Sequence, residues 1–146
     1  MLKLVSVYKS KNAEDVLYEL LKERSVPGSS NINISHTRLP LFADHVKFIK
    51  RKPYRFWYLI TIGNLPIGAC YLTKRNEVGI QLFEAQQGKG YALEALNLLT
   101  TTHKPLKAIP AVRPGRFIAN INPKNEASIR LFKTCGFTEK QVTYEL

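Results

Sequence analysis

The strongest constraint on the fold is a pair of β-rich runs in RFWYLITIGNLPIGACYLT (55–73). β-branched and aromatic residues favour strands, and Gly63-Asn64-Leu65-Pro66 between the runs is a turn sequence, so a hairpin is predicted. EVGIQLF (77–83) is predicted to form a further strand. Three consecutive strands joined by short turns favour antiparallel pairing.

Apolar periodicity predicts the remaining elements. Strands are expected at 2–8, 116–121 and 137–146, and helices at 13–22, 41–50, 125–135 and after the glycines near residue 90. The order is β-α-α-β-β-β-α-β-α-β, and its later helical crossovers favour parallel pairing. We therefore expect an α/β (α+β) fold with helices on both faces of a mixed, mostly antiparallel sheet. A length of 146 residues suits a single domain over 1–146.

The chain is strongly basic, with 22 Lys and Arg against 11 Asp and Glu. This balance favours an anionic partner, whether a phosphorylated cofactor, a nucleotide-linked substrate or a nucleic acid. No apolar run approaches the length of a membrane span or a signal peptide, so a cytoplasmic protein without a membrane partner is expected. Cys70, Cys135 and the three histidines lack metal-ligand spacing, so no metal is expected.

Residues 85–96, AQQGKGYALEAL, place Gly88 and Gly90 directly before a helical pattern. Such a turn commonly points backbone N–H groups at an anion. A P-loop does not fit, because Lys89 lies between the glycines and no hydroxyl follows. A dinucleotide fingerprint does not fit either, because Leu93 occupies the position of its third glycine.

A third signature does fit. Gln87-Gly88-Lys89-Gly90-Tyr91-Ala92 matches Q/R-x-x-G-x-G/A, the pyrophosphate-binding pattern of the Gcn5-related N-acetyltransferase (GNAT) family. ANINPKNEASIRLFKTCGF (119–137) resembles that family's second coenzyme-contacting block. The chain therefore resembles a GNAT protein, nearest to the subgroup of ribosomal-protein alanine and amino-sugar acetyltransferases.

The resemblance implies a sheet of six to seven strands with a splayed parallel pair that holds the pantetheine arm. It also implies transfer of an acetyl group from acetyl-coenzyme A directly to a primary amine in a ternary complex. That amine could belong to a small molecule, an amino-sugar nucleotide or a protein. The implied coenzyme-binding residues are Leu82, Phe83, Gln87, Gly88, Lys89, Gly90, Tyr91, Ala92, Asn120, Asn125, Ser128 and Phe132.

Several of these roles have alternatives. The backbone at Leu82 and Phe83 would polarise the thioester carbonyl as an oxyanion hole does. Asn125 and Ser128 would contact the coenzyme, or Asn125 would simply cap a helix. Phe132 stands where many family members have a tyrosine that protonates the departing thiolate. Water, the substrate or Tyr91 would then supply that proton, unless the protein binds acetyl-coenzyme A without catalysis.

Two residues are candidate bases. An amine with a pKa near ~10.4 must lose a proton before it attacks, and a carboxylate or imidazole can accept it. Glu84, just past a predicted strand, is the first candidate, and an exposed loop acid is its alternative interpretation. His45, on a predicted amphipathic helix, is the second, and its alternative role is packing.

A different functional class also remains open. The aromatic cluster Tyr54, Phe56, Trp57 and Tyr58, together with the basic charge, would suit a nucleic-acid-binding module or a nucleic-acid-directed acyltransferase, although no nucleic-acid recognition motif is present. The acceptor pocket is expected from the first two helices and the loops at 23–40 and 103–115. Monomer and homodimer are both open.

Overall fold

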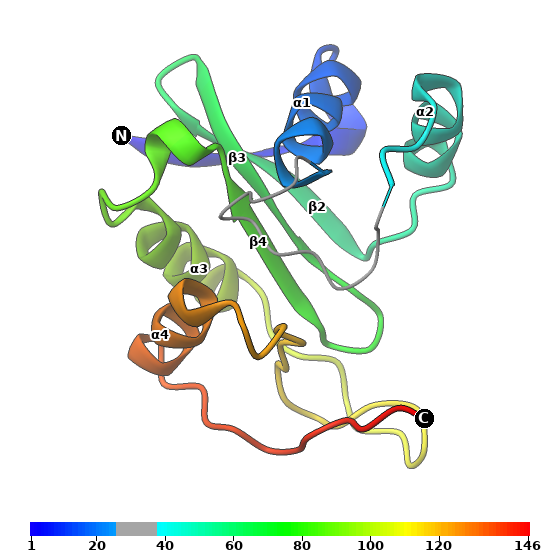
Figure 1. Cartoon of the computed structure of the whole chain (residues 1–146), viewed down its shortest axis with the longest axis vertical. Helices are drawn as coiled ribbons and strands as arrows, with labels where there is room; N and C mark the ends of the chain where they lie inside the picture. Colours follow the sequence, from blue (N-terminus) through cyan, green and yellow to red (C-terminus); the bar gives the residue numbers. More distant parts are fainter. Residues whose placement is uncertain (26–37) are drawn as a thin grey trace.

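The computed structural model describes residues 1–25 and 38–146. Its central sheet has four antiparallel strands in the order β1-β2-β3-β4 (Figure 1). The strands are β1 (Leu2–Ser6), β2 (Phe56–Ile62), β3 (Leu65–Leu72) and β4 (Val78–Leu82). The helices are α1 (Ala13–Ser25), α2 (Phe42–Lys50), α3 (Tyr91–Thr102) and α4 (Glu126–Thr134), with short 3-10 turns η1 (Val7–Lys9) and η2 (Glu84–Gln86).

The predicted hairpin is confirmed as β2 and β3, joined at Gly63 and Asn64. Gly63 has φ +59°, a left-handed conformation that glycine adopts without steric cost. The pairing shifts register between Ile60 and Thr61. Because of this irregularity, Ile67 and Cys70, although three residues apart, are buried in the same core cluster.

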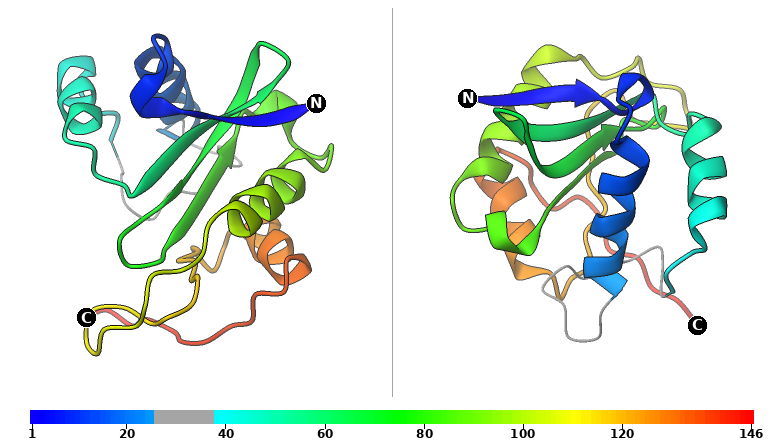
Figure 2. Two further views of the ribbon diagram at one scale, coloured as in Figure 1. Left: turned by 180° about the vertical axis from the view of Figure 1, so that it is seen from behind. Right: turned by 90° about the horizontal axis from the view of Figure 1, so that it is seen from above.

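Helices cover both faces of the sheet, as expected (Figure 2). The core against α3 and α4 contains Ile60, Leu72, Leu82, Ala95, Leu96, Leu99 and Phe132. The core against α1 and α2 contains Ala13, Leu17, Leu20, Ile49, Trp57, Leu59 and Ala69. Adjacent residues Leu59 and Ile60 point to opposite cores, as the two-residue repeat of a strand requires. This two-layered burial confirms the mixed α/β class.

The expected number of strands is wrong, because the described residues form four rather than six or seven. Segment 116–121 makes only one parallel bridge, between Ile118 and Glu77. Val78 N–H donates to the Ile118 carbonyl at 2.7 Å, and Ile118 N–H donates to the Asn76 carbonyl at 2.9 Å. Residues 137–146 form no strand, because no neighbouring edge offers them a hydrogen-bonded ladder.

Candidate active site

The predicted glycine turn lies between η2 and α3. Gly88 and Gly90 have φ values of +76° and +82°, and Gly90 is the N-cap of α3. A Cβ atom built at either glycine would meet nothing within 4 Å. Glycine is therefore required here by the left-handed backbone, and the space in front of the turn is open.

The turn has the properties of an anion site. The first hydrogen bond of α3 runs from Glu94 N–H to the Gly90 carbonyl at 3.2 Å, so the N–H groups of 91–93 have no intrahelical partner. They also lie at the positive end of the helix dipole. Lys89 is exposed beside them, with its Nζ 3.4 Å from Gln86 Oε1. A pyrophosphate fits this environment.

Strand β4 has an open edge where segment 118–122 separates from it. The Val78 N–H donates to the Ile118 carbonyl. Because the backbone N–H and C=O groups of every second residue point to the same edge of a strand, those of Leu82 face this edge too. The Leu82 carbonyl accepts a hydrogen bond from Gln87 Nε2 at 3.4 Å. The Phe83 N–H donates instead to Ile67 within the sheet, at 2.9 Å. Of the two predicted oxyanion-hole groups, the Leu82 amide is therefore the one on the open edge.

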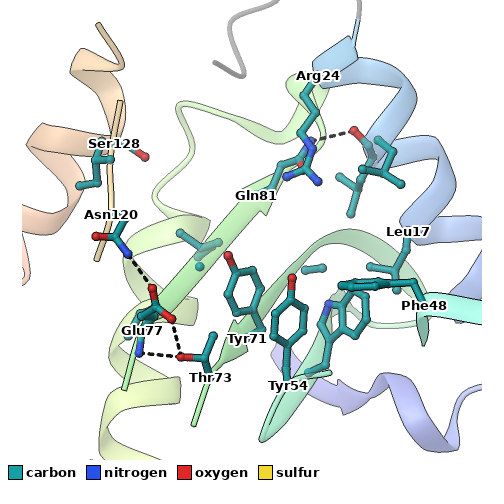
Figure 3. Close-up of a pocket in the computed structure, with 18 of the residues that line it drawn as sticks. Leu17, Arg24, Phe48, Tyr54, Tyr71, Thr73, Glu77, Gln81, Asn120 and Ser128 are labelled. Carbon is teal, nitrogen blue, oxygen red and sulfur yellow. Dashed lines mark hydrogen bonds between the residues drawn. The ribbon is translucent and has the colours of Figure 1, made fainter. Parts of the chain in front are cut away.

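A cavity of about 590 Å³ connects the α1 and α2 face of the sheet with this split (Figure 3). Its volume is in the range of small-molecule sites. Of the predicted site residues it brings together His45, Asn120, Asn125, Ser128 and Phe132. The predicted residues at 82–84 and 87–92 do not line it. Part of the loop predicted to form the acceptor pocket, 26–37, lies outside the described residues.

The cavity contains an acid that sequence reasoning missed. Glu77, directly before β4, accepts hydrogen bonds from Thr73 Oγ1 at 3.0 Å and from Asn120 Nδ2 at 2.7 Å. These contacts fix its carboxylate at the point where β4 and segment 118–122 begin to separate (Figure 3). Its only sequence signal was its place as the first residue of the predicted strand 77–83.

The two predicted bases occupy different environments. Glu84 is exposed, and its backbone N–H donates to Glu23 Oε1 at 2.8 Å. His45 is 4% exposed, and its Nε2 lies 3.1 Å from the Glu14 carbonyl. Burial lowers the pKa of His45, so the ring is neutral and its proton is on the nitrogen that donates to Glu14.

The remaining predicted residues have structural contacts. The Asn125 side chain accepts from Ser128 N–H at 3.1 Å, which makes Asn125 the N-cap of α4. Phe132 is 4% exposed and packs edge-to-face on Phe137, with ring centroids 5.0 Å apart. Tyr91, the first residue of α3, is half-buried.

Two stacked tyrosines form one wall of the cavity. The rings of Tyr54 and Tyr71 are 4.0 Å apart and nearly parallel. Tyr54 is fixed by Tyr8, whose hydroxyl donates to the Tyr54 carbonyl at 3.0 Å. Gly79 lies opposite Tyr71 in the sheet, and a side chain there would collide with the Tyr71 ring. Burial raises the pKa values of both cavity tyrosines, so their hydroxyls remain protonated donors at neutral pH.

Comparison with known proteins decides the family. A family model described as an acetyltransferase (GNAT) domain matches residues 5–138. The chain belongs to the GNAT acetyltransferase family. This confirms the resemblance drawn from residues 87–92 and 119–137, and it places both blocks within one acetyltransferase domain.

Solved structures share the GNAT fold. RimL, a ribosomal L7/L12 alpha-N-protein acetyltransferase in complex with coenzyme A, matches with a TM-score of 0.73 and 18% identity, over 96% of this chain and 81% of that one. A domain from Methanocaldococcus jannaschii matches with a TM-score of 0.75 and 18% identity, over 99% and 93%. Spermidine N-acetyltransferase from Vibrio cholerae, with coenzyme A and spermine, matches with a TM-score of 0.67 and 16% identity, over 96% and 82%. No curated protein shows a significant match to the chain.

Two further features concern the described residues only. Within 1–25 and 38–146, no helix has the length and apolar character needed to cross a bilayer. The same residues contain no group of three or more His, Cys, Asp or Glu that could hold a metal ion.

Proposed function

We propose that this protein transfers the acetyl group of acetyl-coenzyme A directly to a primary amine held in the 590 Å³ cavity. The observation that carries the proposal is the open edge of β4, which has the glycine turn at one end and the cavity along its side. Solved GNAT structures with coenzyme A support the choice of donor. Bound acetyl-coenzyme A supplies an activated thioester.

The chain's own groups have distinct tasks in this proposal. The turn at 87–92 binds the pyrophosphate, and the Leu82 amide donates to the thioester carbonyl as negative charge develops there. Asn125 and Ser128 border the coenzyme from α4. Phe132 cannot donate a proton, so water, the acceptor or Tyr91 returns one to the thiolate.

Glu77 is the base that we favour for the amine. Its carboxylate lines the cavity and is fixed by Thr73 and Asn120. His45 also lines the cavity, but its Nε2 proton is engaged with Glu14 and its pKa is lowered by burial. Glu84 stays a candidate outside the cavity, close to the end of β4.

The test is release of free coenzyme A thiol in the presence of acetyl-coenzyme A and a panel of primary amines. We expect thiol release to require both protein and amine, and the product to carry the acetyl group on nitrogen, as read by mass spectrometry. Amine-independent thiol release, or no release with any amine, would contradict the proposal.

A nucleic-acid partner is the second candidate, and the structure weakens it. The predicted aromatic cluster is divided between the faces of the sheet, because Phe56 stacks on His103 while Tyr54 and Trp57 pack on the other side. The cavity is not basic overall, since Arg24 and Arg51 line it together with Asp44 and Glu77. The excess positive charge therefore lies outside the cavity.

We accordingly predict weak binding of duplex and single-stranded nucleic acid at physiological salt. Six phosphate contacts would give a log–log salt slope of roughly −5 on duplex DNA, whereas a small-molecule enzyme engages few phosphates. Fluorescence anisotropy across a salt series measures both quantities. A submicromolar complex with that steep slope would instead favour a nucleic-acid-directed acyltransferase or a binding module.

A further inference from the structure

Arg24, the second-last residue of α1, extends its side chain into the cavity (Figure 3). Its Nε atom is buried and has no hydrogen-bond partner among the described residues. Gln81, the polar side chain that approaches from β4, donates to the Leu20 carbonyl at 2.9 Å. Arg24 is half-buried, and this one donor of its guanidinium is removed from water without an acceptor.

The nearby acids do not neutralise Arg24. Among residues 1–25 and 38–146 one ion pair forms, between Lys22 and Glu19 on the exposed side of α1. Glu23 accepts a hydrogen bond from the Glu84 backbone N–H. The Glu77 carboxylate accepts hydrogen bonds from Thr73 and Asn120, on the other side of Tyr71 from Arg24 (Figure 3). Burial lowers the pKa of Arg24, and the groups that act against this shift are the phenols of Tyr71 and Tyr54 rather than a carboxylate.

An arginine remains protonated in proteins, so Arg24 is a permanent cation in this cavity. A desolvated charge without a partner destabilises a fold unless a ligand supplies the opposite charge. A guanidinium donates in a planar fork, which suits the paired oxygens of a carboxylate or phosphate. The tyrosine hydroxyls beside it are further donors.

We propose that Arg24 binds an anionic group on the acceptor, so that the substrate is a small molecule with a primary amine at one end and a carboxylate or phosphate at the other. This inference rests on the proposed function, because it assigns the amine to the Glu77 end of the cavity. Gln81, which contacts α1 one turn before Arg24, lies four residues beyond Glu77. Four residues of strand span about 13 Å, so several bonds separate the amine from the anion.

Matched acceptors test the inference. 6-Aminohexanoate is compared with hexylamine, and glucosamine 6-phosphate with glucosamine, so that the two arms separate carboxylate from phosphate recognition. The wild-type protein should acetylate the anionic member of at least one pair roughly 10- to 100-fold more efficiently in kcat/KM, as expected for hydrogen bonds to a charged group. Arg24→Met should abolish this preference by raising KM for the acceptor. Equal rates within both pairs would overturn the inference.

A control variant and a second readout separate this role from a structural one. Lys22→Gln removes one positive charge from the exposed side of the same helix and should keep the preference. Without ligand, Arg24→Met should melt a few degrees higher than wild type, because it removes a half-buried cation whose buried Nε donor has no partner. A lower melting temperature with an unchanged preference would assign Arg24 to the fold and refute the inference.

Thermal shifts distinguish failure of this inference from failure of the proposed function. The anionic compounds should stabilise the wild-type protein and Lys22→Gln but not Arg24→Met, whether or not they are acetylated. Acetyl-coenzyme A should stabilise all three proteins equally. If it stabilises none, the proposed function fails. If Arg24→Met loses the acetyl-coenzyme A shift instead of the acceptor shift, Arg24 binds the coenzyme and the inference fails alone.

Discussion

Gly90→Asp is expected to abolish the stabilisation that acetyl-coenzyme A gives to the wild-type protein. A ligand at 100 times its Kd stabilises the folded state by about 2.7 kcal/mol, which raises the melting temperature of a chain of this size by roughly 5–10 °C. The new side chain would enter the open space before the α3 N-terminus and place a carboxylate where we propose that the pyrophosphate binds. Steric exclusion and charge repulsion act together there. Differential scanning fluorimetry with and without coenzyme measures the effect.

Gly63→Asp is the matched control. Gly63 also has a positive φ, +59°, and a Cβ atom there would also meet nothing within 4 Å. Both substitutions therefore carry a similar backbone cost, about 1 kcal/mol, and should lower the ligand-free melting temperature alike. The hairpin variant should keep the full coenzyme shift. A normal shift in Gly90→Asp would refute the pyrophosphate assignment.

The elements that the sequence predicted correctly are those determined by local patterns. The Gly63-Asn64 turn fixes the β2–β3 hairpin, and glycines at 88 and 90 start α3 because both adopt left-handed backbone conformations. The α4 helix was predicted from the apolar pattern of 125–135, and the alternative role given to Asn125, a helix cap, is confirmed by its hydrogen bond from the Ser128 N–H. Each of these signals involves residues within a few positions of one another.

The missing strands depend on partners distant in sequence. Segment 116–121 has a strand-like composition, but after the Ile118 bridge it diverges from β4 and no ladder forms. Residues 137–146 then lack a strand to pair with, and Tyr144 is 91% exposed. Composition alone cannot distinguish a strand that pairs from one that splays to leave a binding site.

The grouping of the charged and aromatic side chains in the cavity was not predicted, although a pocket beside the first two helices was expected. Arg24, Tyr54, Tyr71 and Glu77 come from α1, the residues before β2, β3 and the residues before β4. No spacing in the chain relates them, and the aromatic cluster that includes Tyr54 gave no sign of this cavity. The exposed Glu84 was predicted as a base because it follows β4. Glu77, whose carboxylate accepts from Thr73 and Asn120, precedes the same strand and was not predicted.

Glu77→Gln is expected to lower kcat by about 10²- to 10⁴-fold, the usual contribution of a positioned proton acceptor. The amide fills the same space, and its single oxygen can still accept from Thr73 or Asn120. Coenzyme affinity should therefore change little, and the acetyl-coenzyme A thermal shift should persist. Steady-state thiol release, with KM for each substrate measured separately, provides the comparison.

Glu84→Gln is the matched variant, because it makes the same chemical change at an acid outside the cavity. The hydrogen bond between Glu84 and Glu23 uses the Glu84 backbone N–H and survives the substitution. If Glu77 is the base, Glu84→Gln should retain nearly wild-type kcat. A large loss in Glu84→Gln alone would transfer the role to Glu84, and normal rates in both variants would direct attention to His45 or a water chain.

The pH dependence of the Glu77→Gln variant tests whether Glu77 accepts the proton of the acceptor amine. Without a protein base, only acceptor molecules that are already neutral can react. Below the amine pKa of ~10.4, the neutral fraction increases about tenfold for each unit by which the pH rises. The residual rate should therefore rise about tenfold per unit between neutral pH and roughly pH 9, narrowing the gap to the wild-type enzyme. A gap that stays constant across this range would show that Glu77 positions the acceptor without accepting its proton.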